Sequence, residues 1–341
     1  MRKFKLLLSL SLFLSILFYN TQLPSDTFSI CAVDPVTGQV GSAGASCIAG
    51  SLILSDVHPG RGVIHTQSYW HPQNQQYARY LMQQGYSPQQ IIDSLVAHDA
   101  QKSPTIRQYG IVDLIGGGRS AAYTGINCFD WKGHLLTPTF AIAGNILLGP
   151  QILDSMRSRF LNTPGTLADK LMAALQGAKV IGADTRCLSR GTSSISAFIR
   201  VGRPQDTTGT LYLDLNVNYT DPGHDPIDSL QVLYNMWLTG ISTISSEIPE
   251  KPFLYQNYPN PFNPITKIKF DIPLNIENEN VKIKLVIYDI LGRETAVLVN
   301  QELKPGTYET EWDASEYQSG VYFYRLAAGE YTETRKMSLV K

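Results

Sequence analysis

Potential metal ligands gather in one acidic stretch of the chain. Asp214 precedes the segment Asp221-Pro-Gly-His-Asp-Pro226, which also contains His224 and Asp225. Carboxylate oxygens at loop spacing are ligands that Ca²⁺ prefers. The same residues fit a turn followed by the N-cap of a helix over residues 227–237, because aspartate favours both positions. The cap is the simpler interpretation, so we expect neither a metal nor another cofactor.

Familiar catalytic motifs are absent from the sequence, which contains no G-x-S-x-G, H-E-x-x-H, P-loop or dinucleotide-binding pattern. Gly116-Gly-Gly118 lacks the further glycine and the helix that a dinucleotide site requires, so we interpret it as a hairpin turn. His65 and His71 fall on different predicted elements, which argues against a shared metal ion.

Size and composition indicate two folded domains. The chain has 341 residues, 43% of them apolar and 17% charged, which suffices for one large core and a smaller one. The formal net charge is -1, with 28 basic against 29 acidic side chains. This balance leaves no excess positive charge for a nucleic acid or an anionic membrane surface.

The N-terminus is typical of a secretory signal peptide over residues 1–22. Met1-Arg-Lys-Phe-Lys5 is cationic, and the run from Leu6 to Phe18 is almost entirely apolar. This run is shorter than the about 20 apolar residues of a membrane span. An uncleaved anchor is the alternative, because no clear small-x-small cleavage site follows, but we expect export without a permanent membrane span.

The four cysteines, Cys31, Cys47, Cys128 and Cys187, all lie in the central part of the chain. In an exported protein an even number permits two disulfides with three pairings. Free cysteine also packs well as a small apolar residue, so both interpretations stay open.

Residues 27–238 alternate groups of predicted strands with groups of predicted helices. Ser87-Pro88, for example, supplies an N-cap and a first-turn proline. This order favours an α+β domain over a regular βαβ alternation. The predicted strands are 27–33, 39–49, 62–67, 107–113, 120–124, 139–144, 194–201 and 211–217, and the predicted helices are 74–85, 87–98, 149–160, 166–176 and 227–237.

Residues 239–252 show no apolar period, and we predict an interdomain linker there. Residues 253–341 then carry short alternating strands separated by Asp, Gly, Pro and Asn turns, which is typical of a β-sandwich. The predicted strands are 267–272, 282–288, 294–299, 306–311, 320–327 and 332–339.

Six motifs of residues 253–341 resemble, in order, the C-terminal sorting domain of type IX secretion cargo. They are Tyr258-Pro-Asn-Pro-Phe-Asn-Pro264, Tyr288-Asp-Ile-Leu-Gly-Arg-Glu294, Leu303 to Gly306, Trp312-Asp313, Ser319-Gly-Val-Tyr-Phe-Tyr-Arg325 and Lys336-Met-Ser-Leu-Val-Lys341. The physical pattern agrees, because Trp312, Tyr322 and Tyr324 supply a small aromatic core. The resemblance implies a small Ig-like β-sandwich that the type IX machinery binds and often removes. An ordinary Ig-like accessory domain is the alternative.

Together with the signal peptide, this resemblance implies a two-step route. The chain would cross the inner membrane first and then leave the periplasm through the type IX machinery. We therefore expect a protein that is secreted or held on the outer-membrane surface of a Gram-negative bacterium.

Residues 27–237 are similar to domain-of-unknown-function family 1028. The similarity rests on Thr27-Phe-Ser-Ile-Cys-Ala-Val-Asp34, Gly60 to Gln67, Arg107-Gln-Tyr-Gly-Ile-Val-Asp113, Thr124-Gly125, Trp131-Lys-Gly-His134, Gly144-Asn-Ile-Leu-Leu-Gly149 and Asp184-Thr-Arg186. It implies the fold of the N-terminal-nucleophile hydrolases, a layered α/β/β/α arrangement. In that fold the first residue of the mature domain attacks an amide carbonyl, and its own α-amino group accepts the proton.

Thr27 stands where this resemblance places the nucleophile. Asn145 would donate its amide to the developing oxyanion, and Asp184 and Arg186 would form a charge pair that positions the substrate or supports the nucleophile. Arg107 and His134 would line the pocket.

Plainer interpretations compete with each of these roles. Thr27 also suits the start of a strand, Asn145 suits a left-handed turn, and Asp184–Arg186 suits a structural pair. Asp26 is a poor residue for signal peptidase to leave behind, and Ala143 stands where related sequences usually carry Gln.

The sequence therefore predicts an exported amidohydrolase acting on a small molecule or peptide. A catalytically inactive binding or surface-assembly domain on the same fold is the alternative.

Overall fold

The computed structural model describes residues 27–245, 247–274 and 281–341, so the predicted signal peptide lies outside the described residues. The fold is mixed, with helices and antiparallel sheets, as the sequence predicts. Among the described residues no helix has the length and apolar character needed to cross a membrane.

The central sheet of the N-terminal part has six antiparallel strands, and β1 lies inside it between β2 and β8. The β1–β2 hairpin turns at the predicted Asp34–Gly38 segment, where Gly38 has a positive φ of 71°. Every residue of β1 except Asp34 is buried. In spatial order the strands are β10 (Leu213–Val217), β9 (Ser196–Gly202), β2 (Gln39–Ser46), β1 (Thr27–Asp34), β8 (Phe140–Gly144) and β7 (Gly133–Thr137).

A second, four-stranded antiparallel sheet packs against the first. One end of the space between them is apolar, with Cys31 and Val33 of the six-stranded sheet against Val57, Val63 and Val112 of the other. The Gly116–Gly118 segment forms the turn between β5 and β6, as predicted, with positive φ at all three glycines. The strands are β3 (Ser55–His58), β4 (Gly62–Gln67), β5 (Gln108–Asp113) and β6 (Arg119–Thr124).

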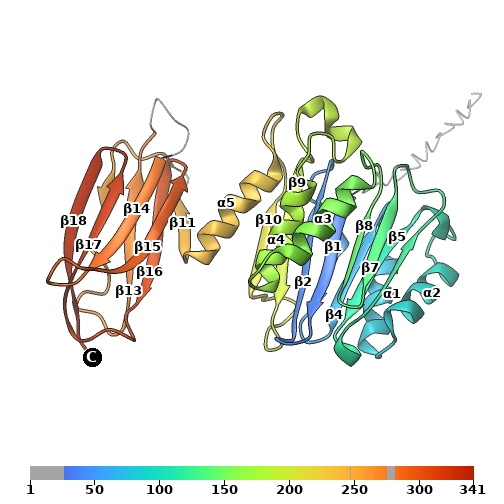
Figure 1. The fold of residues 1–341 in the computed structure, drawn as a ribbon, viewed down its shortest axis with the longest axis horizontal. Helices are drawn as coiled ribbons and strands as arrows, with labels where there is room; N and C mark the ends of the chain where they lie inside the picture. The colour runs from blue at the N-terminus through green and yellow to red at the C-terminus, as the bar shows by residue number, and fades with distance from the viewer. Residues whose placement is uncertain (1–26, 246, 275–280) are drawn as a thin grey trace, which may run out of the picture.

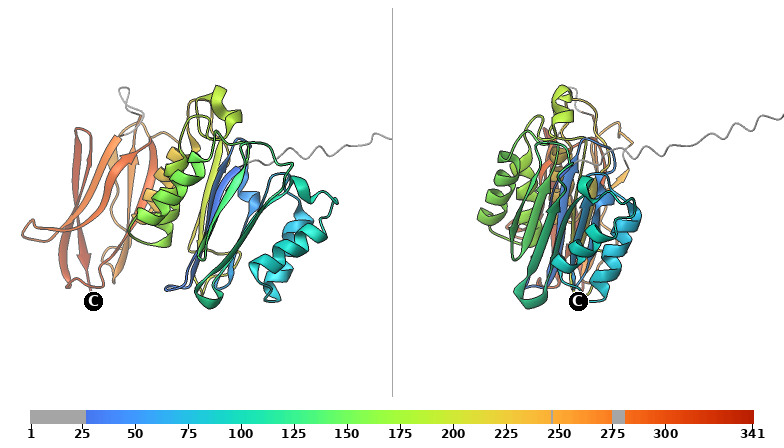
Figure 2. Two further views of the ribbon diagram at one scale, coloured as in Figure 1. Left: turned by 45° about the vertical axis from the view of Figure 1, so that its right-hand side comes forward. Right: turned by 90° about the vertical axis from the view of Figure 1, so that its right-hand side faces the viewer.

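Helices cover the outer faces of the two sheets. Figure 2 shows α3 and α4 on one side of the sheets and α1 and α2 on the other. Capping boxes begin two of these helices, Ser87 with Gln90 for α2 and Thr166 with Asp169 for α4. The helices are α1 (Pro72–Gln83), α2 (Pro88–Ala97), α3 (Gln151–Asn162), α4 (Leu167–Ala178) and α5 (Pro226–Leu238), and the 3-10 helices are η1 (Ser51–Leu54), η2 (Pro104–Ile106), η3 (Ile115–Gly117) and η4 (Thr185–Arg190).

The acidic stretch before α5 forms a helix cap, as the simpler interpretation predicts. The Oδ1 of Asp225 accepts the N–H of Ile227 over 3.0 Å, and its Oδ2 accepts the N–H of Ser193 over 2.7 Å. Asp214 instead forms an ion pair with Arg200 on the neighbouring strand, 2.9 Å long. Asp225 therefore caps helix α5, whereas Asp214 links β10 to β9 through its ion pair with Arg200.

Two four-stranded antiparallel sheets face each other in the C-terminal part. Trp312, Tyr322 and Tyr324 lie in the core between them, where the rings of Trp312 and Tyr322 meet edge to face with centroids 5.2 Å apart. One sheet contains β11 (Ile241–Ser245), β16 (Gly306–Asp313), β13 (Ile265–Ile272) and β12 (Phe253–Leu254), and the other contains β15 (Glu294–Leu303), β14 (Val281–Tyr288), β17 (Gly320–Ala328) and β18 (Tyr331–Leu339).

The segment 239–252, predicted to be an interdomain linker, contains a strand. Residues 241–245 form β11, which pairs with β16 at the edge of a C-terminal sheet. Figure 1 shows α5 between the six-stranded sheet and this edge. The sequence analysis also missed the short strands β3 and β7. All four residues of β3 are buried although three are polar, and in β7 Leu136 is exposed whereas Leu135 is half-buried.

Candidate active site at the start of β1

Thr27, the predicted nucleophile, is the first residue of β1 and is fully buried. It lies opposite Ser46 at the end of β2, and its carbonyl oxygen accepts the backbone N–H of Asn145 over 3.1 Å. In the full-length chain its nitrogen belongs to the peptide bond with Asp26. The free α-amino group that the N-terminal-nucleophile mechanism uses therefore requires cleavage between Asp26 and Thr27.

Asn145 lies directly after β8 and is also fully buried. Its Nδ2 donates to the Oε1 of Gln108 over 2.9 Å, and its Oδ1 has no hydrogen-bond partner among the described residues. Leaving a buried acceptor unsatisfied costs about 1–3 kcal/mol, so this oxygen is a candidate contact for a group that the folded chain does not supply.

The left-handed conformation expected at Asn145 occurs one residue later. Ile146 has a φ of 55°, whereas Asn145 is not among the positive-φ residues. The N–H of Asn145 bonds to the carbonyl of Thr27, so the residue continues the pairing between β8 and β1 and the turn begins after it.

Asp184 and Arg186 form the charge pair that the sequence predicts. The Nη2 of Arg186 is 2.6 Å from the Oδ2 of Asp184, and its Nε is 3.0 Å from the Oδ1. Asp184 is fully buried, whereas the Arg186 side chain is 27% exposed. The Oδ2 of Asp184 also accepts the backbone N–H of Cys47 over 2.9 Å. The carboxylate therefore joins η4 to the end of β2, next to Thr27.

A disulfide between Cys47 and Cys187 strengthens the same contact between η4 and the end of β2, so one disulfide forms where the sequence permits two. It joins residues 140 apart in sequence, with their Cα atoms 5.7 Å apart. Cys31 and Cys128 are buried elsewhere, and burial raises the pKa of the Cys31 thiol to about 12. Because the bond starts beside Ser46, it holds η4 and its charge pair at the beginning of β1.

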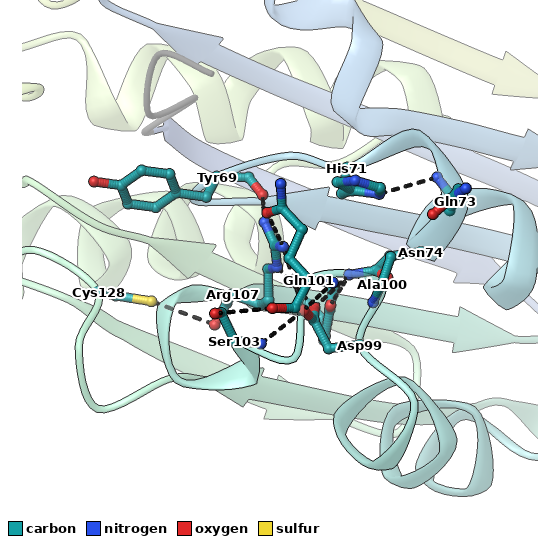
Figure 3. Close-up of polar contacts among 11 residues, drawn as sticks. Tyr69, His71, Gln73, Asn74, Asp99, Ala100, Gln101, Ser103, Arg107 and Cys128 are labelled. Carbon is teal, nitrogen blue, oxygen red and sulfur yellow. Dashed lines mark hydrogen bonds and ion pairs between the residues drawn. The ribbon is translucent and has the colours of Figure 1, made fainter. Parts of the chain in front are cut away.

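Arg107, predicted to line the pocket, has its guanidinium bound inside the protein (Figure 3). Its Nε lies 2.8 Å from the Oδ2 of Asp99, and its Nη2 donates to Gln101 over 2.7 Å. Burial alone would raise the pKa of Asp99, but hydrogen bonds from Arg107, Ser103 and other donors lower it to about 2. The pair is thus ionised at neutral pH.

The third donor of Arg107, Nη1, bonds to the carbonyl of Tyr69 in a strained turn after β4. Ser68 and Tyr69 have φ values of 50° and 45°, which non-glycine residues adopt at a cost. The Oγ of Ser68 is buried without a hydrogen-bond partner in the described part of the chain. Gln67, which precedes this turn, contacts Ser29 of β1, so the strained turn lies close to the start of that strand.

Gln108, which the sequence reasoning missed, crosses the space between the sheets. Its Oε1 accepts from Asn145 and from the Nε2 of Gln67, over 2.9 and 2.7 Å. Its Nε2 donates to the carbonyl of Gly144 over 2.9 Å and to the Oγ1 of Thr124 over 2.9 Å. A glutamine at the start of a mostly apolar strand, Gln108-Tyr-Gly-Ile-Val-Asp113, is the sequence signal that could have revealed it.

The polar contacts extend along β1 through a neutral histidine. Ser29 donates its hydroxyl to Gln67, so the Nδ1–H of His65 donates to Ser29 over 2.9 Å. The Nε2 of His65 then accepts from Ser42 over 2.5 Å. Burial, and secondarily the charge of Arg200, lowers the pKa of His65 to about 3. His65 is therefore uncharged at neutral pH and acts as a link in this network.

His134, the other predicted pocket residue, lies at the exposed end of the network. Its Nδ1 is 2.9 Å from the Oγ1 of Thr124, which contacts Gln108 and through it Asn145. Partial burial lowers the pKa of His134 below its ordinary value. The structure therefore connects two predicted site residues, His134 and Asn145, whereas Arg107 is engaged with Asp99.

Two cavities in the described part of the chain do not include Thr27. One, of about 290 Å³, is lined by Gln73, Asn74, Tyr77, His98 and Ala100. Another, of about 490 Å³, lies between α5 and the C-terminal sheets.

The fold defines a protein of two parts, a mixed domain of helices and antiparallel sheets and an all-β tail. The chain belongs to the Family of unknown function (DUF1028), whose family model matches residues 27–230. Residues 256–340 match the Secretion system C-terminal sorting domain. This sorting domain is the signal that directs a protein to the type IX secretion system. The protein is therefore secreted or attached to the cell surface.

A solved structure supports the assignment of the first part. The chain resembles a crystal structure of protein SPO2555 from Silicibacter pomeroyi, likewise described as DUF1028, with 25% sequence identity and a TM-score of 0.51. The similarity covers 62% of this chain and 88% of that one. No protein of curated function matches this chain in sequence.

Proposed function

We propose that this protein is an exported amide hydrolase of the N-terminal-nucleophile type, with Thr27 as its nucleophile. The observation that carries this proposal is the position of Thr27 at the start of an inner strand, where its carbonyl accepts the backbone N–H of Asn145. The two sheets between pairs of helices support an assignment to the layered α/β/β/α class, and the two facing C-terminal sheets support an Ig-like tail.

The proposed reaction begins after cleavage has freed the α-amino group of Thr27. The Oγ attacks the substrate's amide carbonyl while the α-amino group accepts the hydroxyl proton. The carbon–nitrogen bond then breaks, and the ammonium returns the proton to the leaving amine. Water hydrolyses the resulting ester with the same amine as base, which releases a carboxylic acid and restores the hydroxyl.

The neighbouring residues have distinct proposed roles. Asn145 keeps one Nδ2 hydrogen for Gln108, which leaves the other for the oxyanion of the tetrahedral intermediate. Asp184 and Arg186 act as positioning residues, because their contacts fix η4 beside the end of β2. His134 is the proposed pocket residue nearest the surface, and Arg107 supports the pocket wall through Tyr69.

A specific observation favours the alternative, a catalytically inactive binding or surface-assembly domain. Thr27 and Asn145 are both fully buried, and the nitrogen of Thr27 is an amide nitrogen in the full-length chain. If the mature protein retains residues before Thr27, no free amine forms at Thr27 and the proposed mechanism cannot operate.

N-terminal mapping of the secreted protein separates these two functions. Mass spectrometry of protein recovered from the medium or cell surface should find chains that begin at Thr27. Chains that all begin upstream of Thr27 would exclude the amine-assisted mechanism.

Covalent labelling then tests the nucleophile itself. A β-lactone probe, which acylates N-terminal nucleophiles, should modify one residue of the mature protein, and peptide mapping should place the adduct on Thr27. Thr27→Ser should still be labelled, because serine retains the hydroxyl, and Thr27→Ala should not. An adduct that persists in Thr27→Ala would assign the reactivity to another residue.

A further inference from the structure

Strand β11 precedes the sorting domain matched at residues 256–340, yet it completes one of that domain's sheets. It pairs with β16 from Ile241 opposite Thr310 to Ser245 opposite Thr307. The sheet order β11-β16-β13-β12 places it at an edge. Ile241 is only 5% exposed and belongs to the same apolar core as Trp312. One sheet of the tail (residues 256–340) therefore includes a strand, β11, that lies before the tail in the sequence.

Helix α5 attaches this strand to the central domain, because its two faces enter two different cores. Ile227, Leu230 and Tyr234 belong to the core of the six-stranded sheet. Met236 belongs to the core of the tail, and Val232 packs against it. A cavity of about 490 Å³ remains beside these two residues, between α5 and the segment Lys304–Pro305. Pairing of β11 with β16 is thus a principal part of the contact between the central domain and the tail.

The chain that follows β11 is open to solvent. Glu247, Ile248, Glu250 and Lys251 are all exposed, and Ile248 is 57% exposed. The next strand, β12, begins at Phe253. A protease that cuts between β11 and β12 would leave β11 on the central fragment and β16 on the tail fragment.

We propose that the edge of β16 is a strand-accepting surface, occupied by β11 in the uncut chain, and that it holds the tail to the central domain after this cut. An edge strand presents unpaired N–H and C=O groups that bind an extended polypeptide. Release of the tail then requires a competing extended strand that displaces β11 from β16. This inference is independent of the proposed hydrolase activity.

The test uses the full chain with a site-specific protease sequence inserted between Glu250 and Lys251. After native cleavage, the two fragments should co-elute in size-exclusion chromatography at micromolar concentration. Ile241→Asp should weaken their association by roughly tenfold or more, because it places a charge in the shared core. Ile248→Asp is the matched control, since the same change at an exposed site outside the ladder should leave co-elution intact.

Two further measurements test whether the variant tail is folded and whether a peptide can displace β11. Near-ultraviolet circular dichroism of uncut Ile241→Asp should retain the aromatic signal of the folded tail, so that loss of co-elution reports lost association. A synthetic peptide of residues 239–246 should accelerate dissociation of the cut fragments, and a scrambled peptide should not. Separate elution of the unsubstituted fragments would overturn the proposal, and equal effects of the two peptides would overturn the strand-accepting surface.

Discussion

Gln108 and Asn145 come from different sheets, and their side chains meet where the Nδ2 of Asn145 donates to the Oε1 of Gln108 over 2.9 Å. The same Oε1 accepts from Gln67, and the Nε2 of Gln108 donates to the carbonyl of Gly144. Gln108 therefore joins the strand end beside Thr27 to the four-stranded sheet. Its loss would leave buried polar groups unsatisfied on both sides.

Replacing Gln108 with leucine should destabilise the protein by about 2–4 kcal/mol, because several buried groups lose their partner at once. The free energy of unfolding, measured in urea with the disulfide intact, checks this value. Gln89→Leu is the control, since Gln89 is exposed on α2, where it donates a hydrogen bond to Asp93, so its cost should stay within about 0.5 kcal/mol. Equal costs for both variants would contradict a central role for Gln108.

The oxidised protein should contain one disulfide, between Cys47 and Cys187. Alkylation in denaturant should therefore modify Cys31 and Cys128 without reductant, and all four cysteines after reduction. The double change of Cys47 and Cys187 to alanine should cost about 2–5 kcal/mol, the usual range for a native disulfide. Intact-mass measurement counts the alkyl groups, and four groups without reductant would rule out the bond.

Asp99→Asn should cost about 3–5 kcal/mol at pH 7, because it leaves the buried Arg107 cation without its counter-charge. Urea unfolding again provides the measurement. Asp154→Asn, in an exposed ion pair with Arg157, is the matched control and should cost no more than about 1 kcal/mol. If Asp99→Asn proved as mild as the control, Arg107 would not depend on Asp99 for its burial.

Much of the fold follows from local sequence patterns. The cap at Ser87 and the turn at Gly116–Gly118 depend on neighbouring residues, and the structure contains both. Strand β11 was missed because Ile241 is its single buried residue, and its pairing with the distant β16 decides its conformation. Burial here comes from a partner strand far along the chain, which no local window contains.

The candidate site was predictable only in part for the same reason. Asp184 and Arg186 are two residues apart, so their pairing could be read from the sequence. The engagement of Arg107 by Asp99 and the contact of Gln108 with Asn145 depend on how the two sheets face each other. A sequence pattern identifies such residues as polar but does not reveal which acceptor each one reaches.

The buried histidine makes stability depend on pH between 7 and 5. The pKa of His65 is about 3 in the folded protein, against 6.5 ordinarily, so below about pH 6.5 only the unfolded chain binds the proton. Stability is therefore present above the unfolded pKa and is lost as the pH falls toward the folded pKa. This linkage should remove about 2 kcal/mol between pH 7 and pH 5.

His65→Asn tests this assignment, because asparagine offers a donor and an acceptor but does not titrate in this range. The variant should be less stable at pH 7 yet lose about 2 kcal/mol less than the natural protein on going to pH 5. Urea unfolding at pH 7, 6 and 5 gives both values. His224→Asn, at an exposed position, should keep the natural pH dependence. An unchanged pH dependence in His65→Asn would instead assign the acid loss of stability to other groups, such as His134.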